Sequence, residues 1–149
     1  MTKGQTFAAD DLAFRFRSGR LCLDLLATVA DREGAAFDRW RVPADLGRWG
    51  VEAGLLARPP RVSAAQLGEA RLLREAVHRL LLAALAGAAP EAGDLATLNG
   101  WTRRPALAPQ LEGFGRPCGW AAARPVAGLL ALAAGDAVAL LSEGPLERV

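Results

Sequence analysis

The sequence has few of the side chains from which catalytic and metal sites are usually built. Its 149 residues include one histidine, two cysteines and no tyrosine. The single histidine, His78, excludes any site that needs two imidazoles, and only Glu75, three residues earlier, lies near it at a spacing typical of zinc ligands. We therefore predict no metal and no cofactor, and we interpret His78 as a solvated residue or one at the rim of the core rather than a general base.

The motifs of nucleophilic catalysis and phosphate binding are also missing. There is no Gly-x-Ser-x-Gly turn, and Gly113 and Gly115 neither follow a clear strand nor open a helix. We assign no catalytic residue. Cys22 and Cys118 form no paired motif, and the apolar neighbours of Cys22 favour a small buried side chain over a reactive thiol. A disulfide between these two residues stays open.

Charge of one sign is not in large excess. Eighteen basic residues against 16 acidic ones leave a net charge of +2, which gives no general attraction to nucleic acid or to acidic membranes. Residues 1–11 contain no apolar run or cleavage site of a signal peptide, so we expect a cytoplasmic protein. Lys3 is the only lysine, and this bias, with abundant Ala, Gly and Leu, is typical of a GC-rich bacterial coding sequence.

The length and composition are those of one globular domain. A chain of this size can bury one core, and 52% of its residues are hydrophobic. We predict a single domain over residues 1–149, with a flexible N-terminus over about residues 1–12. The predicted fold class is mainly α with a few short β-strands, a compact helical domain with a buried C-terminal helix and small hairpin elements.

The hydrophobic period changes along the N-terminal half of the chain. Apolar and charged residues alternate over Ala13–Arg17, which predicts a short strand with Phe14 and Phe16 directed inward. The spacing after it predicts a first helix from Arg20 to about Ala30, a second short strand at Phe37–Trp40 and a helix from Pro43 to about Gly54.

The clearest helix begins at the capping box Ser63–Gln66 and ends near Gly87. Its inner stripe is apolar, and four polar residues fall on the other side, where Arg71–Glu75 and Glu75–Arg79 are spaced to form ion pairs. The inner stripe is Leu67, Ala70, Leu73, Val77, Leu80 and Ala84, and the polar side is Arg71, Arg74, Glu75 and His78.

Proline and glycine divide the C-terminal half. A shorter helix is expected from Pro90 or Asp94 toward Trp101, followed by a hairpin around Leu107–Leu111 and Trp120. Pro125 opens a last helix that is apolar nearly all round from Val126 to Leu141. Because such helices are usually buried centrally, we predict a core helix and no membrane span.

Two features could form a ligand site. Arg15, Arg17 and Arg20 make a cationic corner beside Asp24 if the strand and the first helix meet, but the same residues could be a solvated face with one ion pair worth at most about 1 kcal/mol. The four tryptophans either line an apolar pocket or fill the core, and core filling is their commoner role. They are Trp40, Trp49, Trp101 and Trp120.

Several short motifs follow one another in a familiar order. The chain begins with Phe14-Arg15-Phe16-Arg17-Ser18-Gly19-Arg20-Leu21-Cys22-Leu23-Asp24-Leu25 and Ala27-Thr28-Val29, and continues with Pro43-Ala44-Asp45-Leu46 and Trp49, Leu73-Arg74-Glu75-Ala76 and Leu98-Asn99. This order resembles the ABATE domain, the N-terminal part of the CGNR zinc-finger family, over essentially the whole chain.

The resemblance implies the N-terminal regulatory domain of a stress-induced bacterial transcription regulator, which senses a ligand, self-associates or does both. The expected partners are a small-molecule effector and a second copy of the chain. Family members have Asn-Thr where this chain has Ala27-Thr28, so any role of that amide is lost or reassigned here. The ligand-binding candidates are Arg20, Asp24, Thr28, Trp40 and Trp49.

The zinc finger with the Cys-Gly-Asn-Arg motif is absent from these 149 residues, which end at Val149 about where the finger would begin. We therefore expect that this domain does not read DNA, and that DNA contact belongs to the missing finger. The alternative is a free-standing small-molecule-binding protein or enzyme that has lost the finger. A third hypothesis is an interaction module that pairs through an apolar face of the last helix.

Overall fold

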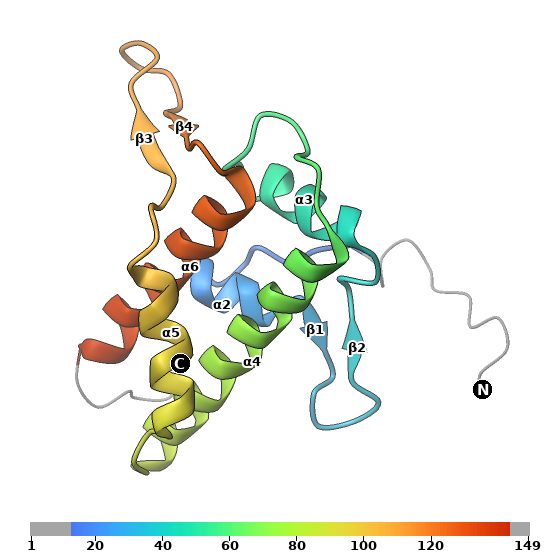
Figure 1. Cartoon of the computed structure of the whole chain (residues 1–149), viewed down its shortest axis with the longest axis vertical. Coiled ribbons are helices and arrows are strands. Elements are labelled where there is room, and N and C mark those ends of the chain that lie inside the picture. Colours follow the sequence, from blue (N-terminus) through green and yellow to red (C-terminus); the bar gives the residue numbers. More distant parts are fainter. Residues whose placement is uncertain (1–12, 144–149) are drawn as a thin grey trace, which may run out of the picture.

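In the computed structural model, which describes residues 13–143, five helices surround one core and two pairs of short strands lie at its edges (Figure 1). This arrangement confirms the predicted fold class. The expected flexible N-terminus lies outside the described residues. The elements are α2 (Leu21–Leu26), β1 (Val29–Ala30), β2 (Phe37–Asp38), α3 (Pro43–Glu52), α4 (Ala64–Ala86), α5 (Ala92–Thr102), β3 (Ala108–Gln110), β4 (Gly119–Ala121) and α6 (Pro125–Ser142).

Helix α4 has the ends that its sequence predicts. The Ser63 hydroxyl accepts the Gln66 N–H at 3.1 Å, and Gln66 Oε1 accepts the Ser63 N–H at 2.8 Å, which completes the capping box. Gly87 ends the helix in the left-handed conformation with φ of 66°. The inner stripe from Leu67 to Leu80 is buried against α5, α6, α2 and α3.

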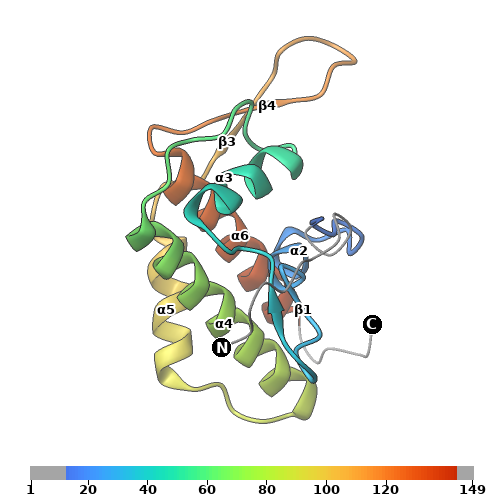
Figure 2. The ribbon, with the colours of Figure 1, turned by 90° about the vertical axis from the view of Figure 1, so that its right-hand side faces the viewer.

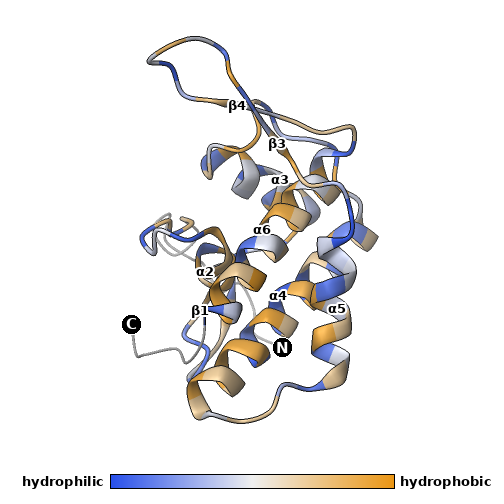
Figure 3. Cartoon of the chain, turned by 90° about the vertical axis from the view of Figure 1, so that its left-hand side faces the viewer, coloured by the Kyte–Doolittle hydropathy of each residue, from blue (hydrophilic) through white to orange (hydrophobic). Residues whose placement is uncertain are grey.

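Helix α6 is the central helix of the fold. It packs against α2, α4 and α5, and the hydropathy colouring in Figure 3 shows it as mostly apolar. Among the described residues it is the one helix long and apolar enough to cross a membrane by length and composition, a test that core helices of soluble proteins also pass. Its contacts confirm the prediction of a core helix. Its buried residues are Val126, Gly128, Leu129, Leu130, Ala131, Ala133, Ala134 and Ala137.

Both strand pairs are antiparallel. Strands β1 and β2 pair Val29 with Asp38, and β3 and β4 pair Pro109 with Trp120. The second strand near Phe37 and the hairpin around Leu107–Leu111 and Trp120 are therefore confirmed. The β3–β4 hairpin projects away from the helices (Figure 2).

The prediction for the N-terminal segment was partly wrong. Residues 14–17 form no strand, although Phe14 is buried and Phe16 stacks on Trp49 with a centroid distance of 6.0 Å. Burial against the core thus fixes these rings without a partner strand. Helix α2 ends at Leu26, short of the predicted Ala30, because the Thr28 hydroxyl and N–H both bond to the Leu25 carbonyl before β1 begins.

The polar side of α4 also differs from the prediction. Arg74 is buried, with 3% of the residue exposed. Glu75 pairs with Arg32 and Arg74, rather than with Arg71 and Arg79 along its own helix. Arg71 and Arg79 pair with Asp38 and Asp94, which lie on β2 and α5. Contacts with other elements, together with the pair between the adjacent residues Arg74 and Glu75, therefore replace the expected pairs within the helix.

Candidate functional site

Arg20 and Asp136 join the start of α2 to the last helix. Arg20 Nη2 lies 3.2 Å from Asp136 Oδ1, and the Cys22 N–H donates to Asp136 Oδ2 at 3.0 Å. The carboxylate therefore accepts a hydrogen bond from the first turn of α2 and also neutralises the guanidinium beside it. Burial and the neighbouring Asp136 carboxylate raise the pKa of the Cys22 thiol to about 12, which agrees with its prediction as an inert buried side chain.

Asp24 does not pair with Arg20, so the expected cationic corner facing this carboxylate is wrong in that detail. Asp24 Oδ1 instead accepts the Ser18 hydroxyl at 2.6 Å and the Ser18 N–H at 3.3 Å. Helix α2 is only six residues long, and its geometry directs Arg20 toward α6 while Asp24 closes the turn that precedes the helix. These contacts hold the Asp24 carboxylate at the edge of an open groove.

This α2–α6 groove has a volume of about 730 Å³. Small residues of α6, Ala131 and Gly135, form part of its wall, and apolar side chains cover most of the rest. Three carboxylates, those of Asp24, Glu52 and Asp136, lie among them. The full lining is Phe16, Gly19, Leu21, Asp24, Glu52, Ala53, Leu55, Thr102, Ala106, Trp120, Ala131, Leu132, Gly135 and Asp136.

Three of the predicted ligand-binding residues lie in the core instead of this groove. Trp40 and Trp49 are fully buried and form an edge-to-face pair with centroids 5.7 Å apart. The Thr28 hydroxyl is buried and accepts a hydrogen bond from Arg74 Nη1 at 3.1 Å. The structure thus places Asp24 in the groove, places Arg20 beside it through Asp136, and separates both from the other candidates.

A charged network surrounds Arg74 on α4. Arg74 bonds to Asp38 and Glu75, and Glu75 also accepts Arg32 Nη1 at 2.6 Å. Burial alone would raise the pKa of Glu75, but hydrogen bonds from Arg32 and Arg74 and their charges outweigh it and lower this pKa to about 2. Since the charges are paired within the network, it holds the strands against α4 rather than offering a free catalytic group.

His78 lies next to this network, in a small cavity of about 370 Å³ that Arg32, Arg74 and Glu75 also line. Its pKa lies below the usual 6.5, chiefly because of burial and also because of the charge of Arg32. The imidazole is half-buried at the edge of this cavity, which is the rim position that was one of the two predicted alternatives. No group of three or more His, Cys, Asp or Glu side chains within residues 13–143 is arranged to hold a metal ion.

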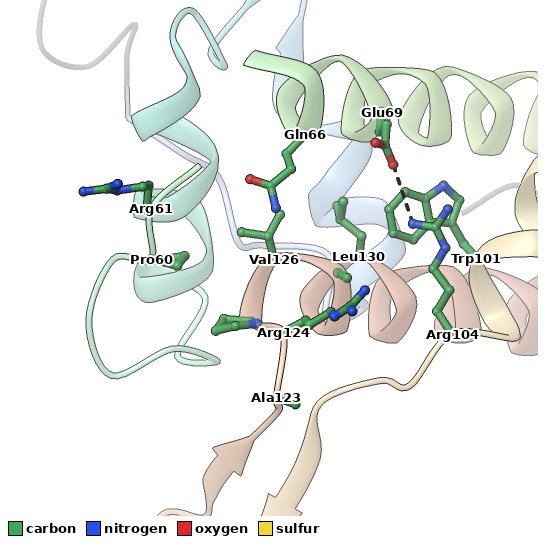
Figure 4. A pocket seen from close by; sticks show the side chains of 12 residues that line it. Pro60, Arg61, Gln66, Glu69, Trp101, Arg104, Ala123, Arg124, Val126 and Leu130 are labelled. Atoms are coloured by element: carbon green, nitrogen blue, oxygen red, sulfur yellow. Dashed lines mark ion pairs between the residues drawn. The ribbon is translucent and has the colours of Figure 1, made fainter. Parts of the chain in front are cut away.

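A second cavity, the arginine cavity, lies where α4 and α6 begin and α5 ends (Figure 4). Its volume is about 590 Å³, and three arginines and one glutamate line it. Arg104 covers the ring of Trp101, with its guanidinium carbon 3.9 Å from the ring centroid. Its Nη1 atom also forms an ion pair with Glu69 Oε2 at 3.5 Å. The lining is Pro60, Arg61, Gln66, Glu69, Trp101, Arg104, Ala123, Arg124, Pro125, Val126, Ala127 and Leu130.

Sequence reasoning missed most residues of both cavities. The signal for Asp136 was present, because it is the one charge within a long apolar helix. Arg61, Arg104 and Arg124 carried no such signal, since they come from three separate connections and each lies next to a proline. Only the tertiary arrangement brings these three residues to the edge of one cavity.

Comparison with known proteins identifies the family of the chain. No curated protein and no solved structure matches it. The ABATE family matches residues 19–144, which include every helix described here. The match begins beside Arg20 and ends just after α6, so both cavities consist almost entirely of matched residues. The chain therefore belongs to the ABATE family, which is described as "Putative stress-induced transcription regulator".

Proposed function

We propose that this domain is the effector-sensing part of a transcription regulator, and that the effector binds in the α2–α6 groove. The groove is the observation that carries the proposal. Its volume of about 730 Å³ lies within the range of small-molecule sites, roughly 300–1,000 Å³. Its lining is mostly apolar with a few polar groups, which is the usual composition of such sites.

The chemistry of the groove favours an amphipathic amine. Asp24 and Asp136 present carboxylates to a cationic or hydrogen-bond-donating head, and the apolar side chains accept a hydrophobic body. Arg20 balances the charge of Asp136 through the contact of 3.2 Å between Nη2 and Oδ1. A ligand amine that approaches Asp136 therefore competes with the bond that joins α2 to α6.

That competition supplies a route from binding to regulation. The groove is lined by α6 together with segments that precede it in the chain, from Phe16 before α2 to Trp120 in β4. A ligand that contacts all of them favours one relative position of α2, α6 and the hairpin over others. Such a shift also changes the position of the C-terminal end of α6. A segment or partner in contact with that end can respond to the shift.

The experiment uses phenethylamine as the probe and Gly135→Leu as the blocking variant. Gly135 lines the groove, and an added Cβ there meets no atom within 4 Å, so a leucine side chain occupies the groove without disturbing the core. Gly68→Leu is the matched control, because Gly68 is also a helical glycine with open space around it but lies on α4.

Phenethylamine is expected to raise the unfolding temperature of the wild type and of Gly68→Leu, but not of Gly135→Leu. A ligand of this size binds in the millimolar range, so titration to about 10 mM suffices. An equal shift in both variants, or no shift in the wild type, contradicts the site. Transcript profiling tests the regulatory part of the proposal by comparing cells that carry the wild-type protein with cells that carry Gly135→Leu. If the ligand binds but transcript levels are the same in both, the result favours a free-standing small-molecule binder.

A further inference from the structure

We propose that the arginine cavity is a second binding site, which takes a small organic anion with a carboxylate or phosphate head and an apolar body. The two cavities share no lining residue, so this proposal does not depend on the function of the α2–α6 groove. Their charges are also opposite, since arginines predominate here and carboxylates predominate there.

The positive charge of the cavity is only partly neutralised. Glu69 pairs with Arg104, and this leaves Arg61 and Arg124 without an ion pair among the described residues. Arg61 comes from the connection before α4, and Arg124 directly precedes α6. In Figure 4 the Arg124 side chain extends over the cavity toward Arg104, whereas the Arg61 side chain points away from it. Arg124 can therefore offer an anionic head the paired N–H groups that match carboxylate and phosphate oxygens, and Arg61 adds positive charge at longer range.

Gln66 adds an amide to the same cavity. Its Oε1 accepts the Ser63 N–H at 2.8 Å, so the capping box uses the oxygen and leaves the side-chain NH₂ group available as a donor. In Figure 4 the Gln66 side chain reaches toward Val126 in the first turn of α6. The first-turn N–H groups of α6 have no side-chain cap, and they add partial positive charge to a site that the arginines already define.

The cavity is larger than a simple inorganic anion needs. Pro60, Val126 and Leu130 give it an apolar wall, and Trp101 lies beneath Arg104 on another side (Figure 4). An adjoining cavity of about 580 Å³ shares Arg104, Arg124 and three other residues with it. This combination favours an anion with a hydrocarbon or aromatic body over inorganic phosphate alone.

The test uses phenyl phosphate and benzoate as probes, with inorganic phosphate as the anion that lacks a body. Binding is measured by calorimetry at constant ionic strength, because exposed arginines attract any anion weakly. The variant Arg124→Ala removes the guanidinium that extends over the cavity. Arg103→Ala removes the same charge from an exposed position outside it and is the matched control.

We expect at least one of the aromatic probes to bind more tightly than inorganic phosphate. The cavity variant should weaken that binding by about 10-fold or more, and the control variant by less than about twofold. Equal weakening in both variants overturns the proposal, because it shows only long-range attraction. Absence of binding by both aromatic probes at about 10 mM overturns it as well, and so does equal affinity for inorganic phosphate.

A measurement on the wild-type protein keeps the test independent of the variants. In amide NMR spectra, phenyl phosphate should shift the signals of Gln66, Val126 and Ala127 and leave that of Gly135 unchanged. Shifts confined to other parts of the chain overturn the proposed location. Because Gly135→Leu blocks only the groove, it should bind phenyl phosphate like the wild type, which separates failure of one site from failure of the other.

Discussion

Arg74 on α4 donates two parallel hydrogen bonds to the carboxylate of Asp38 on β2, Nη1 to Oδ1 at 2.9 Å and Nη2 to Oδ2 at 2.8 Å. The same guanidinium also bonds to Thr28 and Glu75 and lies over the Trp40 ring at 4.9 Å. One buried cation therefore holds the strand pair and the end of α2 against α4.

Arg74→Met should destabilise the protein strongly. The substitution leaves Asp38 and the Thr28 hydroxyl without their buried partner, and loss of one member of such a pair typically costs about 3–5 kcal/mol. Asp38 is 31% exposed, so we expect the lower end of that range. Urea unfolding monitored by tryptophan fluorescence measures the loss.

Arg71→Met is the matched control for this prediction. Arg71 also pairs with Asp38 and bonds to the Trp40 carbonyl, but its side chain is 41% exposed. Its removal should cost only about 1–2 kcal/mol, because solvent compensates an exposed pair. Equal losses in the two variants contradict a special role for the buried guanidinium.

Acid should weaken the protein through Glu75. Its pKa is about 2 in the folded protein against an ordinary value of 4.5, so ionised Glu75 stabilises the fold fully above pH 4.5. This contribution is lost as the pH falls from 4.5 through 2. Urea unfolding at several pH values should show a smaller loss over that range for Glu75→Gln, whereas parallel curves for variant and wild type speak against it.

The two thiols should differ in reactivity. Cys22 is buried and burial raises its pKa to about 12, whereas Cys118 is exposed. At pH 8 a chromogenic disulfide reagent should label one thiol of the folded protein rapidly and both after denaturation. Cys118→Ser should abolish the rapid phase. Rapid labelling that persists in Cys118→Ser means that Cys22 is accessible in the folded state.

Alanine should have opposite effects at Gly50 and Gly68. A Cβ at Gly50 would lie 2.7 Å from Leu56 Cδ1 and 2.8 Å from Leu129 Cδ2, and Leu129 is fixed in the core. We expect Gly50→Ala to cost about 1–3 kcal/mol through overpacking. Gly68 has open space around it, so Gly68→Ala should stabilise α4 by about 1 kcal/mol. Denaturant midpoints compare the two, and a gain at Gly50 would contradict the close α3–α6 contact.

Local chemistry made much of the fold predictable. Ser63 and Gln66 specify the start of α4 through bonds between residues three apart, and Gly87 ends it because glycine adopts positive φ without strain. Pro125 and the apolar run after it likewise predict α6 and its burial. Each of these signals acts between close neighbours in the chain, so the sequence contains it in full.

Tertiary structure decided the contacts between distant residues. Asp24 could be predicted as a ligand candidate, but its position in a groove depends on α6, which lies more than 100 residues later in the chain. The pairing of Arg20 with Asp136 and the burial of Arg74 depend on the same helix packing. A periodic pattern tells which face of a helix is apolar, but not which charge on another element will meet it.

The sequence by itself thus determined the helices, both ends of α4, the start of α6, the hairpin and the family resemblance, because each rests on local bonding or on the order of short motifs. Only the tertiary structure decided which ionic partners meet and which side chains enclose the groove and the arginine cavity. The physical reason is that charge pairing and cavity shape arise between segments that chain connectivity leaves far apart, and their positions are set by packing around α6.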